Sequence, residues 1–123
     1  MSSTHTILVA DDEVDLCKTL ERVLAKEGYR VLTAHEGEKA LALLKEEGIH
    51  LLLLDLKMPG LGGLEVLQRV RKDYPSLAVV IMTAYGSLAS AREAMQLGAV
   101  DYLTKPFDLN VVRAVVKEAL SGG

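Results

Sequence analysis

The sequence predicts an α/β fold in which five strands alternate with five helices in one domain. Short apolar runs typical of buried strands recur along the chain, and each is followed by apolar residues at helical spacing. Glycine or proline stands at most of the boundaries, and the connections are short. Repeated strand–helix–strand units form right-handed crossovers, so we expect a parallel sheet with helices on both faces. The 123 residues suffice for one core, and we expect a single domain over 1–123 with flexible ends at 1–5 and 121–123.

The first half of the chain contains two strand–helix units. Residues 6–10 form a strand, and the helix after it ends at Gly28, a typical helix stop. Residues 29–34 form a more polar strand, and the helix over 37–47 ends at Gly48. The apolar face predicted for the first helix comprises Val14, Cys17, Leu20, Val23 and Leu24.

The second half begins with four consecutive leucines, residues 51–54, that lead into Asp55. Such a run cannot alternate between a wet and a dry face, so it predicts a strand buried on both sides. A helix follows from Leu64 to near Tyr74, because Pro75 disfavours helical geometry in the residue before it. The remaining elements are a strand at 77–82, an alanine-rich helix at 88–97, a strand at 99–104 and a helix at 109–120. The alanine-rich helix has few large apolar side chains, so we expect it to be the most mobile.

The polarity of the strands predicts their order in the sheet. The most polar strand, 29–34, suits an edge, whereas the apolar strands at 6–10 and 51–54 suit the centre. This pattern favours the flavodoxin-like order 2-1-3-4-5. In that order, ligands bind where the first and third strands meet, outside their carboxyl ends.

Composition excludes several classes of function. A net charge of −3 and a pI of about 5.6 give no basic surface for nucleic acid and no attraction to anionic membranes. The single Cys17 excludes an internal disulfide, and the three histidines lack metal-ligand spacing. The sequence has no apolar span long enough to cross a membrane and no signal peptide, so we expect a cytoplasmic protein.

Polar side chains follow four of the predicted strands. Since the carboxyl ends of parallel strands share one edge, these residues are expected to meet there. The residues concerned are Asp11, Asp12, Asp55, Thr83 and Lys105. Three neighbouring carboxylates repel one another unless a cation compensates, and oxygen ligands favour Mg²⁺. Lysine and threonine donors suit phosphoryl oxygens, so the set predicts a site that holds a phosphoryl group against a nucleophilic Asp55.

At these residues the sequence resembles the response regulator receiver domains of bacterial two-component signalling. The resemblance covers essentially the whole chain. It rests on Asp11-Asp12, Asp55 with Met58-Pro59-Gly60, Thr83-Ala84, Tyr102 and Lys105-Pro106-Phe107. The amino-acid sequence at 82–86 and 101–108 is most similar to receivers of the nitrogen-regulation type, which precede an ATPase domain and a DNA-binding domain.

The resemblance implies that a sensor histidine kinase phosphorylates Asp55 with Mg²⁺ as cofactor. The ion would be held by Asp12, Asp55 and the main-chain carbonyl of Lys57, with Asp11 acting largely through water. The chain would then be a phosphoacceptor switch and not an enzyme, and it would regulate transcription through an output domain outside this sequence. Gly62 departs from the family pattern, because many receivers carry Asp or Asn there, and the start of the third helix is therefore in question.

The resemblance also implies how the signal leaves the site. Lys105 would pair with the phosphoryl group across a cis bond to Pro106, Thr83 would move to hydrogen-bond it, and Tyr102 would rotate inward. Because the alanine-rich fourth helix can shift cheaply, we expect the face made by the fourth helix, fifth strand and fifth helix to bind a partner or form a homodimer. Apart from the resemblance, the side chains of Lys57 and Tyr85 stand two residues beyond Asp55 and Thr83 and are long enough to screen the phosphate from water, so we expect them to set its lifetime; ordinary exposure of the two loops is the alternative.

Four other interpretations stay open at this point. Asp55 could only cap a turn. A haloacid-dehalogenase-type phosphatase also uses a strand-end Asp, but places a second Asp where Lys57 stands here. A nucleotide-binding flavodoxin-like module would need a glycine-rich loop after the first strand, where Asp11 and Asp12 stand instead. An inert receiver that serves only for dimerisation would keep the same fold.

Overall fold

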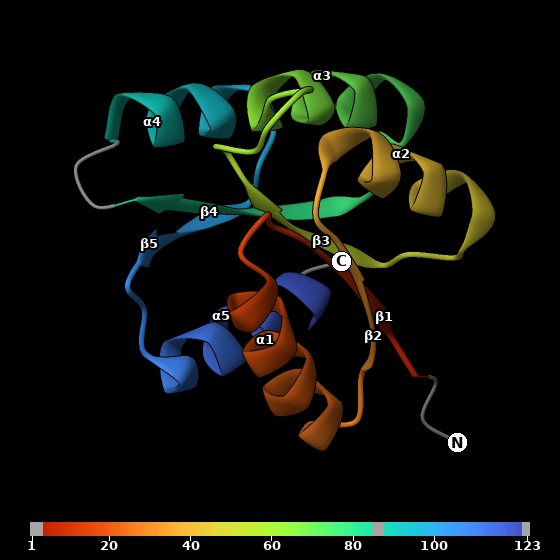
Figure 1. Ribbon diagram of the computed structural model, residues 1–123, viewed down its shortest axis with the longest axis vertical. Coiled ribbons are helices and arrows are strands. Elements are labelled where there is room, and N and C mark those ends of the chain that lie inside the picture. The colour runs from red at the N-terminus through yellow and green to blue at the C-terminus, as the bar shows by residue number, and fades with distance from the viewer. Residues whose placement is uncertain (1–3, 85–87, 122–123) are drawn as a thin grey trace.

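A computed structural model describes residues 4–84 and 88–121, and it shows a five-stranded parallel sheet between two layers of helices (Figure 1). The strand order is β2-β1-β3-β4-β5, which confirms the predicted fold class. The strands are β1 (Thr6–Ala10), β2 (Arg30–Ala34), β3 (Leu51–Asp55), β4 (Ala78–Ala84) and β5 (Asp101–Lys105). The helices are α1 (Val14–Lys26), α2 (Gly37–Glu46), α3 (Gly63–Asp73), α4 (Leu88–Gln96) and α5 (Leu109–Ser121).

The burial of the strands follows their polarity. Every residue of β1 and β3 is buried, as expected for central strands covered on both faces. In β2, at the edge, only Ala34 is buried. The prediction that the polar strand lies at the edge is therefore confirmed.

Two hydrophobic cores form because successive side chains of a strand point to opposite faces. Leu8, Leu52 and Leu54 pack with α2, α3 and α4, whereas Leu51 and Leu53 pack with α1 and α5. Figure 1 shows the corresponding layers, with α2, α3 and α4 above the sheet and α1 and α5 below it. The run of leucines thus serves both cores, and it holds Asp55 rigidly at its end.

Four local predictions meet different outcomes. β4 continues two residues beyond the predicted 77–82 to Ala84, and Thr83 lies near its end as predicted. β5 begins at Asp101, because the N–H of Ala99 still donates to Ala94 of α4. Val14 is 46% exposed, which corrects its assignment to the buried face of α1. The third helix starts normally at Gly63 although Gly62 offers no capping side chain.

Within residues 4–84 and 88–121, every helix falls short of the length and apolarity that a bilayer crossing requires.

Candidate functional site

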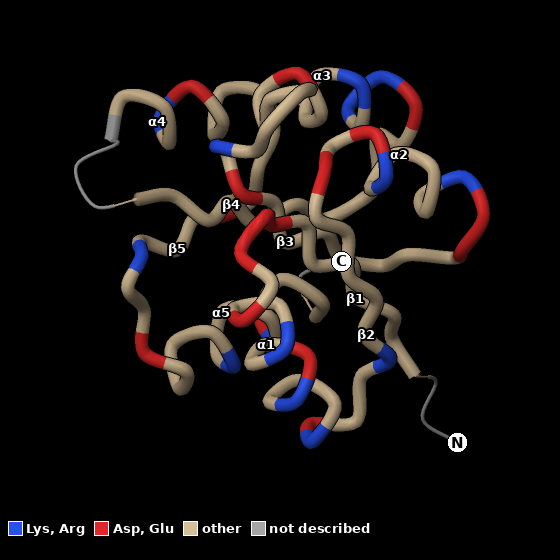
Figure 2. Tube along the Cα trace, in the orientation of Figure 1, with Lys and Arg blue, Asp and Glu red and all other residues tan. Residues whose placement is uncertain are grey.

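The predicted polar residues meet at the carboxyl end of the sheet. Asp11 directly follows β1, Asp55 ends β3, Thr83 lies near the end of β4 and Lys105 ends β5. The register pairs Thr83 with Thr104, one residue before Lys105, across the β4–β5 edge. Figure 2 shows acidic chain segments gathered at the centre of this view, between α1 and α3.

The main chain and neighbouring groups hold Asp11 in place. Its own N–H donates to the carbonyl of Ala34, and its carbonyl accepts the thiol of Cys17 at 3.3 Å. The N–H of Glu13 donates to Asp11 Oδ1 at 2.8 Å. Burial, with repulsion from the Asp11 carboxylate, raises the pKa of the Cys17 thiol to about 11, so Cys17 remains a neutral thiol.

Three carboxylates form one cluster. Asp11, Asp12 and Asp55 each offer an oxygen, and these oxygens lie within 4.8 Å of one another. Asp11 is completely buried and Asp55 is 5% exposed, whereas Asp12 reaches solvent. Two of the three charges are therefore withdrawn from water, which is costly unless cations face them.

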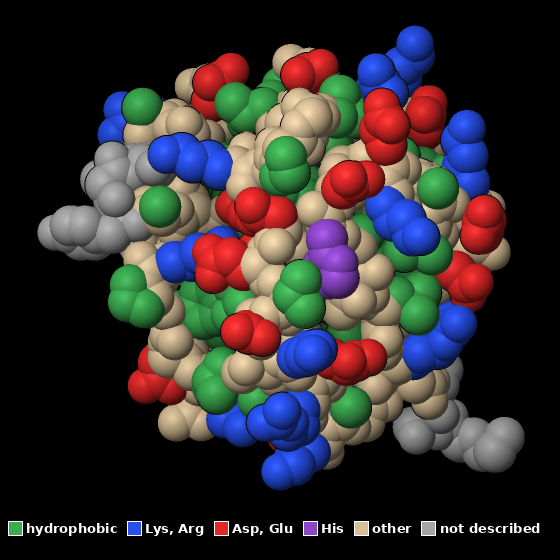
Figure 3. Space-filling model, in the orientation of Figure 1, with side chains coloured by type: hydrophobic (Ala, Val, Ile, Leu, Met, Phe, Trp, Pro, Cys, Tyr) green, Lys and Arg blue, Asp and Glu red, His purple; other side chains and the backbone are tan. Residues whose placement is uncertain are grey.

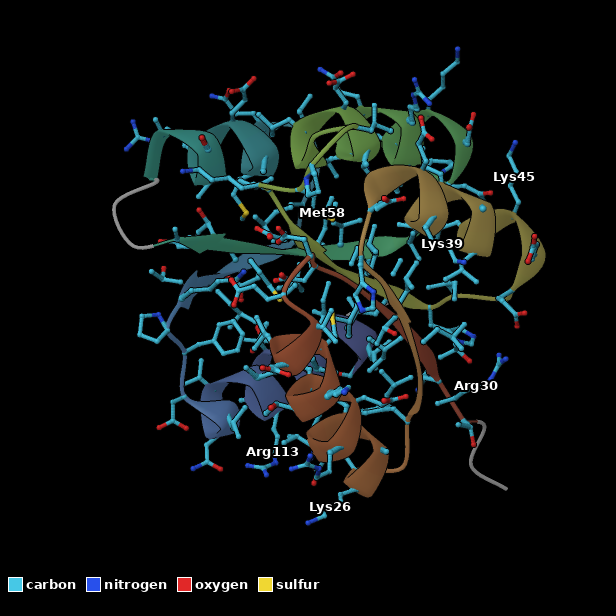
Figure 4. The ribbon with its side chains drawn as sticks, viewed as in Figure 1. Lys26, Arg30, Lys39, Lys45, Met58 and Arg113 are labelled. Atoms are coloured by element: carbon cyan, nitrogen blue, oxygen red, sulfur yellow. The ribbon has the colours of Figure 1, made fainter. Side chains whose placement is uncertain are left out.

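Lys105 supplies one positive charge to this cluster. Its Nζ lies 2.7 Å from Asp11 Oδ2, 3.2 Å from Glu13 Oε1 and 3.5 Å from Asp55 Oδ2. Burial lowers the pKa of the ammonium, but its contact with Asp11 and the attraction of Asp55 outweigh that effect, so the pKa is raised. Lys57 also lines the cavity beside these carboxylates, whereas Figure 4 shows Lys26, Arg30 and Lys45 extending outward from the edges of the molecule.

The two oxygens of Asp55 have different partners. Oδ1 accepts the main-chain N–H of Lys57 at 3.0 Å, whereas Oδ2 faces Lys105. Burial raises the pKa of Asp55 to about 6; repulsion from Asp11 adds to the rise, and the Lys57 N–H and the Lys105 charge oppose it. Near neutral pH the carboxylate is thus largely ionised and is only partly compensated.

A tight glycine contact shapes the loop after β3. A Cβ added at Gly63 would lie 2.5 Å from both the carbonyl oxygen of Asp55 and Cα of Leu56, closer than real atoms approach. The N–H of Gly63 also donates to the carbonyl of Leu56 at 3.1 Å. Gly63 therefore allows the start of α3 to pack directly against the strand end that carries Asp55.

The carboxylates of Asp12 and Asp55 face a cavity of about 320 Å³, and Asp11 is buried behind them. It is lined by Asp12, Glu13, Asp55, Leu56, Lys57, Leu64, Thr83, Ala84, Ser90 and Lys105. Figure 3 shows acidic side chains around the centre of this face. A larger hollow of about 520 Å³ lies between α2 and α3, but its lining mixes scattered charges of both signs without convergent donors. We therefore assign the chemistry to the smaller cavity.

The cluster fits a hard divalent cation. All its ligand atoms are oxygens, and among residues 4–84 and 88–121 the buried Asp11 Oδ2 has no hydrogen-bond partner, although Lys105 Nζ lies 2.7 Å from it as an ion-pair contact. Asp11, Asp12 and Asp55 are the side chains that would hold Mg²⁺. The part predicted for the Lys57 carbonyl stays a prediction.

Thr83 and Tyr102, the two residues predicted to transmit the signal, differ in their exposure. Thr83 is 3% exposed and lines the cavity beside Asp55, whereas Tyr102 on β5 is 39% exposed. The Lys105–Pro106 bond is cis, as the resemblance implied. The predicted role of Tyr85 falls outside the described residues.

The structure adds three residues that sequence reasoning did not single out. Glu13 contacts Lys105, Gly63 packs on Asp55 and Ser90 of α4 lines the cavity. Glu13 could have been noticed only as a third acidic residue after Asp11 and Asp12. The family pattern marks Gly62 but does not reveal that Gly63 packs against Asp55, and nothing in the sequence distinguishes Ser90 from other helix serines.

Comparison with known proteins agrees with this geometry. The response regulator receiver domain family matches residues 7–117. The transcriptional regulatory protein ZraR of Klebsiella oxytoca is 41% identical over 94% of this chain and 26% of its own length. Sporulation initiation phosphotransferase F of Bacillus subtilis is 40% identical over 93% of this chain and 92% of its own length.

Solved structures show the same arrangement. The receiver domain of NtrX from Brucella abortus superposes with a TM-score of 0.92 at 34% identity, covering 95% of this chain and 99% of that one. This chain spans about a quarter of the length of ZraR and nearly all of phosphotransferase F. The family match, the strand order and the cluster at the sheet edge lead to one conclusion: the chain belongs to the response regulator receiver domain family.

Proposed function

We propose that this chain is a switch that accepts a phosphoryl group on Asp55. The observation that carries the proposal is the convergence of Asp11, Asp12 and Lys105 on the Asp55 carboxylate at the floor of an open cavity. Receiver domains accept phosphoryl groups from sensor histidine kinases, and we propose such a kinase as the partner.

The transfer needs a nucleophile, a positive charge and alignment. An oxygen of the ionised Asp55 carboxylate attacks phosphorus and forms a P–O bond, while the bond to the donor breaks and its electron pair leaves with the donor imidazole or carboxylate. Lys105 is placed to donate to a phosphoryl oxygen, and Thr83 lines the same cavity with a hydroxyl donor. Mg²⁺ held by Asp11, Asp12 and Asp55 with the Lys57 carbonyl would supply neutralising charge.

Slow loss of the phosphoryl group suits a switch better than an enzyme. No carboxylate stands two residues after Asp55 to act as a general acid or base, because that position is Lys57, which is exposed beside the cavity. We propose that Lys57 and Tyr85 influence the access of water and so set the lifetime of the phosphate.

The signal would leave through Thr83 and Tyr102. Attraction of the Thr83 hydroxyl to the phosphoryl group would free space for the Tyr102 ring, which is now 39% exposed on β5. The face formed by α4, β5 and α5 carries exposed apolar side chains at Met95, Val100, Tyr102 and Val111. We propose this face as the surface that binds a second copy or another partner. The buried residues of α4 include the small Ala91 and Ala94, so the helix can shift with little loss of packing.

The downstream role rests on the relatives. ZraR and NtrC are named transcriptional regulators, and this chain matches about a quarter of each. We propose that the chain controls transcription through an output domain beyond this sequence.

A test separates a switch from a phosphatase. The protein is incubated with acetyl phosphate and Mg²⁺, and the phosphate retained on the chain is compared with that released. A switch holds close to one phosphoryl group per chain and releases phosphate slowly, and EDTA abolishes both. Rapid release without a retained phosphoryl group would contradict the proposal.

A further inference from the structure

The side chain of Glu13 contacts the lysine of the site. Its Oε1 accepts a hydrogen bond from Lys105 Nζ at 3.2 Å, and Glu13 lines the same cavity as Asp55. The contact joins residues that are 92 positions apart in the sequence.

Capping of α1 does not explain the position of this side chain. Glu13 is the N-cap residue of α1, but its side chain makes no capping hydrogen bond. The start of the helix is held by the main chain of Glu13: its carbonyl accepts the N–H of Cys17 at 3.1 Å, and its N–H donates to Asp11 Oδ1. The carboxylate is therefore available to act at the site.

Lys105 faces as many carboxylates as it has donors. An ammonium carries three N–H groups, and carboxylate oxygens of Asp11, Glu13 and Asp55 lie within 3.5 Å of Lys105 Nζ; the oxygen of Glu13 accepts a hydrogen bond from it, and the other two contacts are ion pairs. A phosphoryl oxygen on Asp55 needs one of these donors. Asp11 is completely buried, whereas the Glu13 side chain is 61% exposed, so water can solvate the Glu13 carboxylate when Lys105 leaves it.

Building on the proposed function, we propose that Glu13 is a positioning residue that holds Lys105 in the unphosphorylated state. The incoming phosphoryl group takes the place of the Glu13 carboxylate as the third partner of the ammonium. Glu13 thereby competes with anionic phosphodonors for Lys105, and it raises the donor concentration needed for phosphorylation without slowing the transfer itself.

The test measures the rate of phosphorylation at increasing acetyl phosphate in excess Mg²⁺. Glu13→Gln keeps the length of the side chain and removes its charge, so the half-saturating concentration should fall about two- to fivefold, the range expected for an exposed ion pair. The maximal rate should stay unchanged, because the contact is already broken when transfer occurs. Glu13→Ala should shift the concentration in the same direction, and beryllofluoride should bind both variants more tightly than the wild type.

The matched control is Asp15→Asn, which removes the same charge from the first turn of α1. It should shift the half-saturating concentration much less than Glu13→Gln. An equal shift in the control, or no shift in either Glu13 variant, would overturn the competition with Lys105. Failure of the wild type to take up any phosphoryl group would instead refute the proposed function, and this inference with it.

Discussion

The ammonium of Lys105 lies 2.7 Å from the carboxylate of Asp11, which is completely buried. Lys105 is also the partner that the proposed function assigns to the phosphoryl group. Under the proposed function, the same positive charge would stabilise the unphosphorylated fold and bind the phosphoryl group.

Replacing Lys105 with Met should destabilise the protein by about 2–3 kcal/mol in the absence of Mg²⁺. The loss follows because the buried Asp11 charge then has no cation facing it, although the slight exposure of Lys105 moderates the effect. Urea unfolding measures the free energy, and Mg²⁺ should restore part of it. Lys57→Met, at an exposed position, is the control and should change stability by less than about 0.5 kcal/mol.

The contribution of Asp55 to the stability of the Mg²⁺-free protein should decrease as pH rises through about 6. The pKa of Asp55 is raised by burial from 3.8 to about 6, so the folded state binds a proton more tightly than the unfolded state does. The stabilisation is full below pH 3.8 and is lost above pH 6. The free energy of unfolding of Asp55→Asn, minus that of the wild type, should therefore increase by about 2–3 kcal/mol from pH 4 to pH 7.

Addition of Mg²⁺ should reduce this difference, because the ion favours the ionised carboxylate. Unfolding by urea at several pH values, with and without Mg²⁺, measures both effects. A difference between variant and wild type that does not vary with pH would mean that Asp55 titrates normally.

Replacing Gly63 with Ala should destabilise the fold by about 1–3 kcal/mol and impair phosphorylation. The added methyl group would lie 2.5 Å from the Asp55 carbonyl oxygen, and the main chain there cannot move away cheaply. Thermal unfolding and acetyl phosphate labelling measure the two effects.

Gly62→Ala is the matched control. No atom lies within 4 Å of a Cβ at that position, and its φ of −70° is open to any residue, so it should be neutral or slightly stabilising. Equal losses in the two variants would show that the close approach at Gly63 is unimportant.

Replacing Thr83 with Ala should separate phosphorylation from signalling. The variant keeps Asp55 and Lys105, so it should still bind beryllofluoride, but the buried hydroxyl that would draw β4 toward the phosphoryl group is gone. Addition of beryllofluoride should then change the amide chemical shifts of α4, β5 and α5 less than it does in the wild type. Thr104→Ala, on the neighbouring strand, is the control, and beryllofluoride should change its amide chemical shifts as much as it does in the wild type. Shifts confined to the Asp55 loop even in the wild type would refute the proposed path.

Most of the fold could be predicted because its determinants are local. The four leucines before Asp55 require burial on both faces, and the polar strand ending at Ala34 suits an edge. Once the strands are parallel, their carboxyl ends meet, so the contact of Lys105 with Asp11 and Asp55 could be anticipated. The roles of these residues in phosphorylation remain proposals.

The features of the fold and of the site that could not be predicted depend on contacts that no local sequence pattern encodes. Helical spacing places Val14 toward the core, but it does not say whether a neighbouring element covers the first turn, and Val14 is exposed. The close packing of Gly63 on Asp55 depends on how the loop after β3 turns back. The reach of Glu13 to Lys105 depends on where two distant chain segments end.

The most direct test of the central claim is intact mass measurement after incubation with acetyl phosphate and Mg²⁺. The wild type should gain the mass of one phosphoryl group, and Asp55→Asn should gain none. Asp73→Asn, at the exposed end of α3, controls for loss of a carboxylate elsewhere and should gain the same mass as the wild type. Equal labelling of the Asp55→Asn variant, or no labelling of the wild type, would contradict the assignment of Asp55 as the phosphoacceptor.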